Sequence, residues 1–448
     1  MTAIHAKQAL LPEGWVRDVR IKLAEGKICG IEREADAQPA DERHNTVVPA
    51  IGNLHSHAFQ RAMAGLAEIR GPGDDSFWSW RTTMYKFALS MTPDHVEAVA
   101  AQLYMEMLEA GFARVGEFHY LHNDAEGGHY GDVAEMAARI AAASVETGIG
   151  LTLLPVLYAH SGFGGQPPLD GQRRFIHSRD SFGRLMERCE TITASLSGAV
   201  LGVAPHSLRA VTEEELRELV SLNGSRPIHI HIAEQTKEVE DCLAWSGARP
   251  VDWLFDHVEV DNRWCLIHAT HMSEDETRRM ARSGAVAGLC PITEANLGDG
   301  VFNAPTFLEE KGRFGVGSDS NILISLPEEL RTLEYSQRLS RRARNVIADP
   351  GESTGRRLFD DACRGAGQAL QSHSGIEIGA SADLIALDSR GSPHLPKDRL
   401  LDYWIFAGGV VVDAVWAAGR KRVEGGRHIR RDAISRRFNH VMRELAQA

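Results

Sequence analysis

Short runs of apolar or small residues recur through the middle of this chain, and several of them end in a histidine or an aspartate. The runs cover residues 47–54, 227–230, 264–267 and 313–318, and the side chains that follow them are His55, His57, His231, His268 and Asp319. Runs that are apolar on both faces are typical of buried parallel strands. If such strands close into a barrel, their carboxyl ends converge on one mouth, where barrel enzymes carry their chemistry.

Strand and helix patterns alternate from residue 47 onward and predict the fold class. Eight strands are expected, at 47–54, 113–118, 151–157, 200–204, 227–230, 264–267, 285–289 and 313–317. Helices are expected between them at about 93–110, 132–146, 180–194 and 212–222, the first with Thr92 as N-cap and Pro93 at its first position. Eight such units predict an α/β fold, a (β/α)8 barrel. A doubly wound open sheet is the alternative, but no Gly-x-Gly-x-x-Gly follows the first strand.

Both ends of the chain carry strand patterns with turns between them. These patterns cover residues 3–11, 15–23 and 27–32, and again 382–388 and 410–423. We therefore expect one small β-domain built from the two termini, in segments 1–46 and 376–448, beside a barrel domain over 47–375. A helix over 431–446 is expected to pack outside the β-domain.

The composition limits the partners and the compartment. The chain has 448 residues and a net charge of -12, which argues against nucleic acid but still permits a small anionic substrate held by local arginines. Its six cysteines are widely spaced, as in a reduced set of thiols. There is no signal pattern and no run of 18 apolar residues, so we expect a cytoplasmic protein without a membrane segment.

Two long connections interrupt the alternation of strands and helices. Residues 60–81 contain a Trp-rich stretch, and residues 159–179 are rich in glycine and proline. Long loops above a barrel mouth often act as lids, although a solvated surface excursion explains the second one equally well.

The histidines and the aspartate have the chemistry of a metal site. In a strand, His55 and His57 point to the same face because side chains alternate with a period of two. Imidazole and carboxylate groups that converge with His231 can supply the three or four ligands of a catalytic zinc, which keeps one open position for water. Core histidines hydrogen-bonded to backbone are the alternative for each position alone.

Two acidic residues have positions suited to catalysis. Asp319 follows an apolar strand and lies too far before Pro327 to cap a helix there, which favours a ligand that also accepts a proton from water. Glu234 follows His231 by three residues and is placed to shuttle protons between the water and a leaving group. The alternative for Glu234 is an ordinary first-turn carboxylate favoured by the helix dipole.

Two arginines occupy loops expected above the same mouth. Arg81 follows the Trp-rich loop, and Arg209 follows the fourth strand. Guanidinium groups bind carboxylates bidentately, and the polar side chains of Gln60, Tyr120 and His206 lie nearby. The pattern favours a carboxylate-binding pocket over two solvated surface charges.

In this order, His55-x-His57, His231, His268 and Asp319 resemble the amidohydrolase superfamily, and His231-Ile232-Ala233-Glu234 resembles its deaminase branch. The resemblance implies a distorted (β/α)8 barrel beside a β-sandwich made from both chain ends. It implies one divalent metal held by His55, His57, His231 and Asp319, because the fourth strand lacks the lysine that two-metal members carry. The side chains suit zinc, iron, manganese or cobalt, and zinc is expected because it is the most frequent of these metals in such sites.

Further motifs are similar to the iminohydrolase family that acts on N-formimino-L-glutamate in histidine degradation. They lie at residues 53–61, 77–81, 117–120, 204–209 and 229–235. The similarity implies that the substrate is held by Gln60, Arg81, Tyr120, His206 and Arg209, with both arginines on its carboxylates. Trp78 and His119 would shape or support the pocket. A homodimer is also implied.

The reaction that follows is hydrolysis to N-formyl-L-glutamate and ammonia. Metal-activated hydroxide would attack the formimino carbon, with Glu234 as the proton shuttle, helped by Asp319, and His268 stabilising the tetrahedral species. One alternative keeps this chemistry on guanine, adenosine derivatives or another heterocycle, which Trp78 and Trp80 could stack against. A barrel that serves only as an assembly scaffold is the second alternative.

Overall fold

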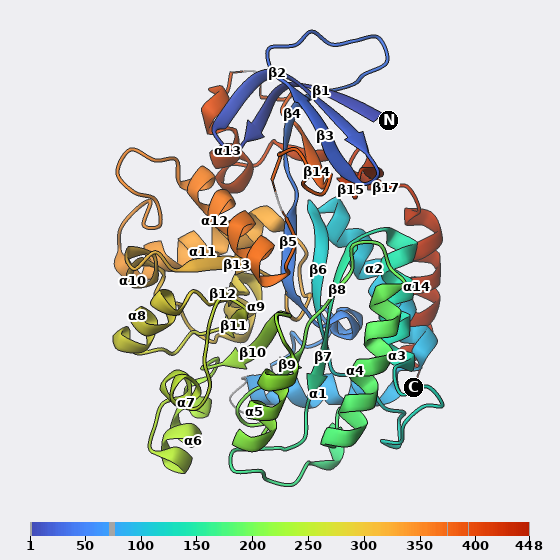
Figure 1. The fold of residues 1–448 in the computed structure, drawn as a ribbon, viewed down its shortest axis with the longest axis vertical. Helices are drawn as coiled ribbons and strands as arrows, with labels where there is room; N and C mark the ends of the chain where they lie inside the picture. Colours follow the sequence, from blue (N-terminus) through green and yellow to red (C-terminus); the bar gives the residue numbers. More distant parts are fainter. Residues whose placement is uncertain (1, 71–76, 374, 393, 448) are drawn as a thin grey trace.

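The computed structural model describes residues 2–70, 77–373, 375–392 and 394–447. It contains a barrel with helices around it and, at one end, a sheet formed by both termini (Figure 1). No helix in these ranges is both long enough and apolar enough to cross a bilayer. All six cysteines are free, and only Cys29 is exposed.

Eight strand positions form the barrel, and all of them run parallel. They are β5 (Ile51–Ser56), β6 (Phe112–His119), β7 (Gly150–Leu157), the interrupted pair β8 (Val200–Leu201) and β9 (Ala204–Pro205), β10 (Ile228–Ile232), β11 (Trp264–His268), β12 (Val286–Leu289) and β13 (Arg313–Val316). Single parallel bridges join Val203 to Ile228 and Ser56 to Asp319, and they close the ring on both sides. The predicted (β/α)8 barrel is confirmed, and closure excludes the open doubly wound sheet.

Helices surround the barrel, and the first of them lies at its mouth while most of the others cover its outside. They are α1 (Phe77–Ser90), α2 (Pro93–Glu109), α3 (Glu135–Thr147), α4 (Arg179–Ala194), α5 (Glu213–Leu222), α6 (Thr236–Ser246), α7 (Pro250–His257), α8 (Glu274–Ser283), α9 (Pro291–Leu297), α10 (Ala304–Glu309), α11 (Leu326–Arg341) and α12 (Thr354–Ala369). Thr92 caps α2 by accepting from the amide of His95, with Pro93 at the first position, as predicted.

The termini share one continuous eight-stranded sheet, in the order β17-β16-β15-β14-β4-β1-β2-β3. Its strands are β1 (Thr2–Leu11), β2 (Gly14–Ala24), β3 (Lys27–Glu32), β4 (Glu42–Pro49), β14 (Leu384–Asp388), β15 (Val411–Ala417), β16 (Arg420–Glu424) and β17 (Arg427–His428). Strands from both ends enclose one apolar cluster that includes Ile21, Leu384 and Trp416. The sandwich expected from the termini is therefore a single sheet folded around its own core.

Three local predictions need correction. The strand expected over 47–54 is two strands, because residues 47–49 end β4 in the terminal sheet and β5 begins at Ile51. The fourth barrel strand is broken at Gly202, where an added Cβ would lie 2.7 Å from the carbonyl oxygen of Pro227 on the neighbouring strand. The connection over 60–81 is not one loop, because a 3-10 helix (Ala58–Met63) opens it and α1 closes it. Residues 71–76 of the Trp-rich stretch lie outside the described ranges.

The terminal helix α14 (Arg431–Leu445) does not simply pack outside the β-domain. It lies along α2 of the barrel (Figure 1), where Ser435 donates to Gln102 and Arg431 pairs with Glu109. α13 (Leu400–Phe406) also returns to the barrel, where it packs on α12. The helix buries Ile434, Val441 and Leu445 in the main core and pairs arginines with acidic residues of α2, and the local pattern of residues 431–446 does not reveal this partner.

Helix α12 seals the end of the barrel opposite the mouth. Leu370, just after this helix, packs with Leu54 and Ile267 in the barrel interior. Its carbonyl accepts from Thr152 of β7, and the carbonyl of Ala369 lies 2.9 Å from Nε2 of His229 in β10. The barrel floor is therefore filled, and only the carboxyl ends of the strands remain for chemistry.

We predict opposite effects for the same substitution at two helical glycines. An added Cβ at Gly365 of α12 would lie 1.9 Å from the carbonyl oxygen of Phe314 in β13, so Gly365→Ala should lower stability by about 2 kcal/mol or more. At Gly183 of α4 nothing lies within 4 Å, so Gly183→Ala should raise stability by about 0.5–1 kcal/mol. Thermal unfolding midpoints check both, and an unchanged Gly365→Ala midpoint would contradict the close packing of α12 on β13.

Candidate metal centre and active-site pocket

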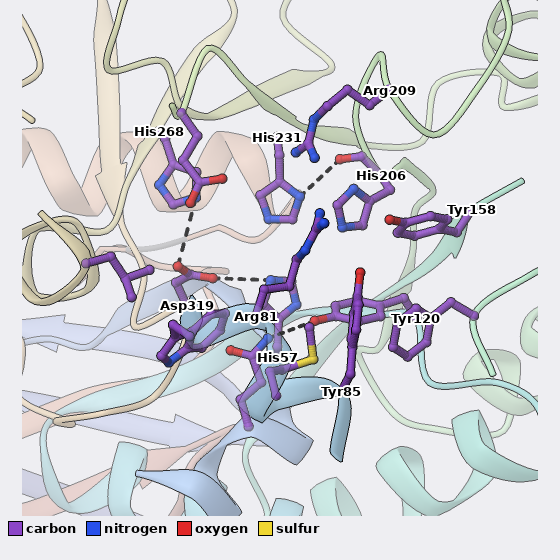
Figure 2. A pocket seen from close by; sticks show the side chains of 16 residues that line it. His57, Arg81, Tyr85, Tyr120, Tyr158, His206, Arg209, His231, His268 and Asp319 are labelled. Atoms are coloured by element: carbon purple, nitrogen blue, oxygen red, sulfur yellow. Dashed lines mark hydrogen bonds and ion pairs between the residues drawn. The ribbon is translucent and has the colours of Figure 1, made fainter. Parts of the chain in front are cut away.

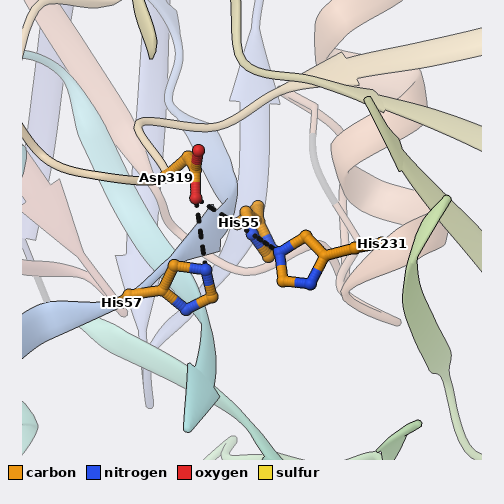
Figure 3. Close-up of side chains that lie close together, drawn as sticks. All are labelled: His55, His57, His231 and Asp319. Atoms are coloured by element: carbon orange, nitrogen blue, oxygen red, sulfur yellow. Dashed lines mark hydrogen bonds and ion pairs between the residues drawn. The ribbon is translucent and has the colours of Figure 1, made fainter. Parts of the chain in front are cut away.

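Four predicted ligands meet at the mouth of the barrel (Figure 3). Nε2 of His55 lies 3.0 Å from Nε2 of His231, and Oδ1 of Asp319 lies 3.3 Å from Nε2 of His55 and 3.2 Å from Nε2 of His57. One ligand atom from each residue lies within 4.8 Å of the others, and all four residues are buried. Ligands bound tetrahedrally at zinc distances are about 3.4 Å apart, so the cluster has the size of one metal site.

The outer nitrogens of two histidines explain why their Nε2 atoms are available. Nδ1 of His57 lies 3.0 Å from the carbonyl oxygen of Phe118, and Nδ1 of His231 lies 3.0 Å from that of His206. A carbonyl only accepts, so each Nδ1 carries the proton and each Nε2 presents a lone pair to the centre. Burial lowers the pKa of His55 to about 3 and that of His231 well below its usual range, so these imidazoles are neutral. The donor set fits a divalent cation.

Asp319 supplies the negative charge of this centre. Burial alone would raise its pKa, but the adjacent imidazoles of His55 and His57 and the nearby charge of His268 outweigh burial and hold the pKa well below its usual range. The backbone of Asp319 is in the left-handed region, with φ of 43°, as are Ala233 and His268 at the ends of β10 and β11. Such strained residues are characteristic of functional sites and aim these strand ends toward the mouth.

His268 and Glu234 lie next to the four ligands. Nε2 of His268 is 3.7 Å from Oε1 of Glu234 and 3.9 Å from Oδ2 of Asp319, while its Nδ1 is 3.3 Å from Oε1 of Glu294. Burial opposes the imidazolium, but Glu234, Glu294 and Asp319 together raise the pKa of His268 to about 10. Burial raises the pKa of Glu234 to about 7, against the charge of His268. This pair offers a cation and a carboxyl group that exchanges its proton near neutral pH.

The sequence patterns did not identify Glu294 or Glu238 as functional residues. Oε1 and Oε2 of Glu238 accept from the amides of Ala233 and Glu234, both at 3.1 Å, and fix the turn that presents Glu234. Glu294 accepts from the amide of Cys290 at 2.8 Å as well as facing His268. His268, Cys290 and Glu294 are also spaced as possible metal ligands, but Glu294 is already engaged by these two hydrogen-bond partners.

A pocket lies above the centre, and every predicted substrate-binding residue lines it: Gln60, Arg81, Tyr120, His206 and Arg209. Figure 2 shows the side chains of Arg81 and Arg209 pointing into the same space. The side-chain amide of Gln60 donates to the hydroxyl of Tyr120 at 2.7 Å. Burial, with the charge of Arg209 as the next cause, lowers the pKa of His206 well below its usual range, so this imidazole is neutral.

The two arginines lie on different elements of the fold. Arg81 lies in α1 rather than on a loop, and Arg209 lies in the turn after β9, where the amide of Ala210 donates to the carbonyl of Ser207. The charges of both arginines act on Tyr158 and on His206, which places them around one region of the pocket. The arrangement can bind a small anion beside a metal centre.

Several lining residues were not predicted as contacts. Tyr85, Tyr158 and Phe175 line the pocket, and so does Trp80, which was expected there only for a heterocyclic substrate. Tyr158 directly follows β7, so the same reasoning about strand ends could have found it. Tyr85 lies four residues after Arg81 on one helix face, which is visible only once α1 is known. The side chain of Trp78 lies outside the described residues.

His119 lies behind the pocket in a cluster of histidines. Its ring centroid is 5.1 Å from that of His122, which is 4.9 Å from that of His177, and His177 stacks on His129. Burial lowers the pKa of His119 to about 3, that of His177 to about 2 and that of His122 well below its usual range. The neutral rings of His119, His122 and His177 support the segment that follows β6 and carries Tyr120.

Comparisons with known proteins agree with this geometry. Residues 46–422 match the Amidohydrolase family, and residues 1–45 match the N-terminal domain of formimidoylglutamate deiminase HutF. A formimidoylglutamate deiminase of Pseudomonas aeruginosa is 50% identical over 99% of this chain and 100% of its own length. A 5-methylthioadenosine/S-adenosylhomocysteine deaminase of Natronomonas pharaonis is 25% identical, over 90% of this chain and 88% of its own.

Two solved structures extend the comparison. The crystal structure of an amidohydrolase from Brucella melitensis has a TM-score of 0.98 and 59% identity, and it covers both chains completely. An adenosine deaminase from Xanthomonas campestris with bound zinc has a TM-score of 0.82 at 20% identity, over 100% of this chain and 99% of its own, and shares the fold.

We expect one divalent metal per chain, and we expect substitution of a ligand, but not of an adjacent residue, to lower the metal content. Asp319→Asn weakens the charge of the donor set and should reduce bound metal several-fold, whereas Glu234→Gln should retain it because Glu234 is not among the four converging residues. Elemental analysis of purified protein after dialysis measures the stoichiometry. Equal metal loss in both variants, or two metals in the wild type, would contradict this assignment.

The histidine cluster behind the pocket predicts acid lability. Unfolded histidines bind protons near pH 6.5, but burial lowers the folded pKa of His177 to about 2, so the unfolded state binds more protons as pH falls below about 6.5. Stability should therefore fall from pH 6.5 downward, and His177→Gln should flatten the fall while lowering stability at pH 7.5. Thermal midpoints from pH 8 to pH 5 test this, with the exposed His440→Gln as control. A slope shared by His177→Gln and wild type would contradict it.

Proposed function

Because this chain belongs to the amidohydrolase family, we propose that it hydrolyses N-formimino-L-glutamate to N-formyl-L-glutamate and ammonia. The observation that carries the proposal is the pair Arg81 and Arg209, which both line one buried pocket beside the four-residue centre. A substrate with carboxylates at one end and an amidine at the other matches these two groups. The deiminase of Pseudomonas aeruginosa, similar along its whole length, supports the same substrate.

The residues divide into a metal-holding set and a proton-transfer set. His55, His57, His231 and Asp319 would hold one divalent metal ion, which supplies the Lewis acidity that makes water a nucleophile near neutral pH. Glu234 takes the proton from the attacking water, because its raised pKa keeps it a competent base near pH 7. Asp319 assists by accepting a hydrogen bond from that water.

Proton return completes the reaction. Water adds to the formimino carbon, and the positively charged His268 stabilises the charge that develops on the tetrahedral species. Glu234 then donates this proton to the terminal nitrogen, takes the hydroxyl proton of the tetrahedral species and passes it to the same nitrogen. The bond from carbon to this nitrogen breaks, ammonia leaves, and the formyl carbonyl remains on the glutamate nitrogen.

Positioning is assigned to the remaining pocket residues. Arg81 and Arg209 bind the carboxylates through charge-assisted hydrogen bonds. Oε1 of Gln60 is buried without a hydrogen-bond partner among the described residues, so it is available to accept an N–H of the amidine. Tyr120, which already accepts from Gln60, and the neutral His206 complete this wall.

The proposal extends to the metal, the assembly and the setting. We take zinc as the metal, because three imidazoles and one carboxylate suit it and the Xanthomonas campestris adenosine deaminase carries zinc. We take a homodimer, the cytoplasm and histidine degradation as the assembly, compartment and metabolic context. The aromatic lining by Trp80, Tyr85 and Phe175 favours a heterocycle deaminase as the second candidate.

Ammonia release with each substrate class decides between these two functions. We expect the metal-loaded protein to release ammonia from N-formimino-L-glutamate and to leave a purine panel that includes adenosine and guanine intact. Arg81→Met and Arg209→Met should each lower kcat/KM by about 100-fold, because each removes charge-assisted hydrogen bonds to a carboxylate. Steady-state kinetics measure the loss.

A matched arginine control completes this experiment. Arg217 is exposed on α5 and pairs with Glu213, so Arg217→Met should leave kcat/KM unchanged. If both pocket variants retained the wild-type specificity constant, or if a purine were the better substrate, the dicarboxylate assignment would be wrong.

A further inference from the structure

Gln172 lies in the connection between β7 and α4 and has a fixed amide orientation. Its Oε1 is 2.8 Å from the backbone nitrogen of Leu169, which can only donate, so this atom is the acceptor of the side-chain amide. Its Nε2 therefore faces the opposite way, 2.8 Å from the hydroxyl of Tyr158 and 3.4 Å from that of Tyr85. Gln172 is completely buried, so water does not compete for these hydrogen bonds.

The direction of the amide determines the direction of the hydroxyls. Because Nε2 of Gln172 donates to Tyr158, the phenol oxygen is an acceptor there and its own proton points elsewhere. Burial raises the pKa of Tyr158, so that proton is retained. Tyr85 forms a hydrogen bond with Tyr158, and at most one of the two hydroxyl protons is used between them. At least one O–H of the pair is therefore left for an acceptor other than these three side chains.

A carboxylate bound in the pocket could accept a hydrogen bond from that O–H. Both tyrosines line the pocket, and Figure 2 shows Tyr85 and Tyr158 on one side of it, beside Arg81 and His206. The charges of both arginines act on Tyr158, which places its oxygen in the region where a carboxylate would be held. An O–H that donates to an anion forms a short, charge-assisted hydrogen bond.

We propose that Tyr158, with Tyr85 beside it, donates a hydrogen bond to a substrate carboxylate, and that Gln172 is the positioning residue that gives this donor its direction. The inference rests on the proposed function for the identity of the substrate. It adds two residues that contribute to substrate specificity, Tyr158 at the end of β7 and Gln172 in the connection over 159–179. The inner arm of that connection, which includes Gln172, Arg174 and Phe175, is buried, so it is a wall of the site rather than a solvated excursion.

The test uses substitutions that change one atom or the polarity of one group. Tyr158→Phe removes the hydroxyl alone. Gln172→Glu can still accept from Leu169, but its second oxygen accepts from Tyr158 and turns the hydroxyl away from the ligand. We expect each variant to raise KM for N-formimino-L-glutamate, and the Kd for glutarate measured by calorimetry, by about 10- to 100-fold. The value of kcat should stay within about threefold, since the reacting atoms are untouched.

A double variant separates the relay from a loss of local structure. If Gln172 acts through Tyr158, Tyr158→Phe with Gln172→Glu should be no weaker in binding than Tyr158→Phe alone, whereas independent structural damage would add. Tyr130→Phe is the matched control, because Tyr130 accepts from Arg174 outside the pocket lining. Metal content and the thermal midpoint are measured for each variant.

The outcomes keep this inference distinct from the proposed function. Unchanged KM and glutarate Kd in Tyr158→Phe would overturn the inference and leave the proposed function intact. Absence of ammonia release by the wild type would defeat the proposed function, and glutarate binding by the same variants would still decide the relay. Additive losses in the double variant would overturn the positioning role of Gln172.

Discussion

The site depends on the parallel seam where β13 meets β5. Asn53 accepts from the amide of Ser318 at 3.1 Å and donates to its hydroxyl at 2.6 Å, and Asn321 donates to the carbonyl of His57 at 3.0 Å. An added Cβ at Gly317 would lie 2.7 Å from the backbone nitrogen of His55, so only glycine permits this approach. The seam both closes the barrel and brings Asp319 to the two histidines of β5. Closure of the barrel and assembly of the candidate centre therefore depend on the same contacts.

The centre and the recognition groups rest on different parts of the molecule. The four converging residues lie at or just beyond the ends of β5, β10 and β13, whose backbones are held by the sheet (Figure 1). Arg81 and Tyr85 lie on α1, and Gln172 lies in the connection after β7. A barrel of this kind keeps its chemistry on rigid strands while helices and loops above the mouth set the substrate.

Much of this arrangement was predictable because its signals are local. Apolar runs that end in His55, His231 and Asp319 predict both the strands and the mouth, because the carboxyl ends of parallel strands lie on the same side of a barrel. The same reasoning placed Arg209, which follows a strand. It placed Arg81 above the mouth but on the wrong kind of element, because the helix that carries Arg81 begins within a motif that has little helical periodicity.

The rest depends on contacts between distant segments, which no local pattern encodes. Glu294 is 26 residues from His268, and only the packing of α9 brings the two together. The same holds for α14, which lies on α2 with buried apolar side chains and with ion pairs such as Arg431 with Glu109 across 322 positions of sequence. Gln172 is a polar residue in a glycine-rich connection, and its role became visible only with the orientation of its amide.

A single buried carboxylate links recognition with proton transfer. Glu238 fixes the turn of Glu234 through two amides, and its charge is the largest influence that raises the pKa of Arg209 against the cost of burial. The net charge of the chain is -12, so the cationic pocket is a local feature, in which nearby buried carboxylates favour the charged form of Arg209. A substrate carboxylate bound by Arg209 would add its charge to that of Glu238 around one guanidinium group, and the charge of Arg209 also acts on Glu234.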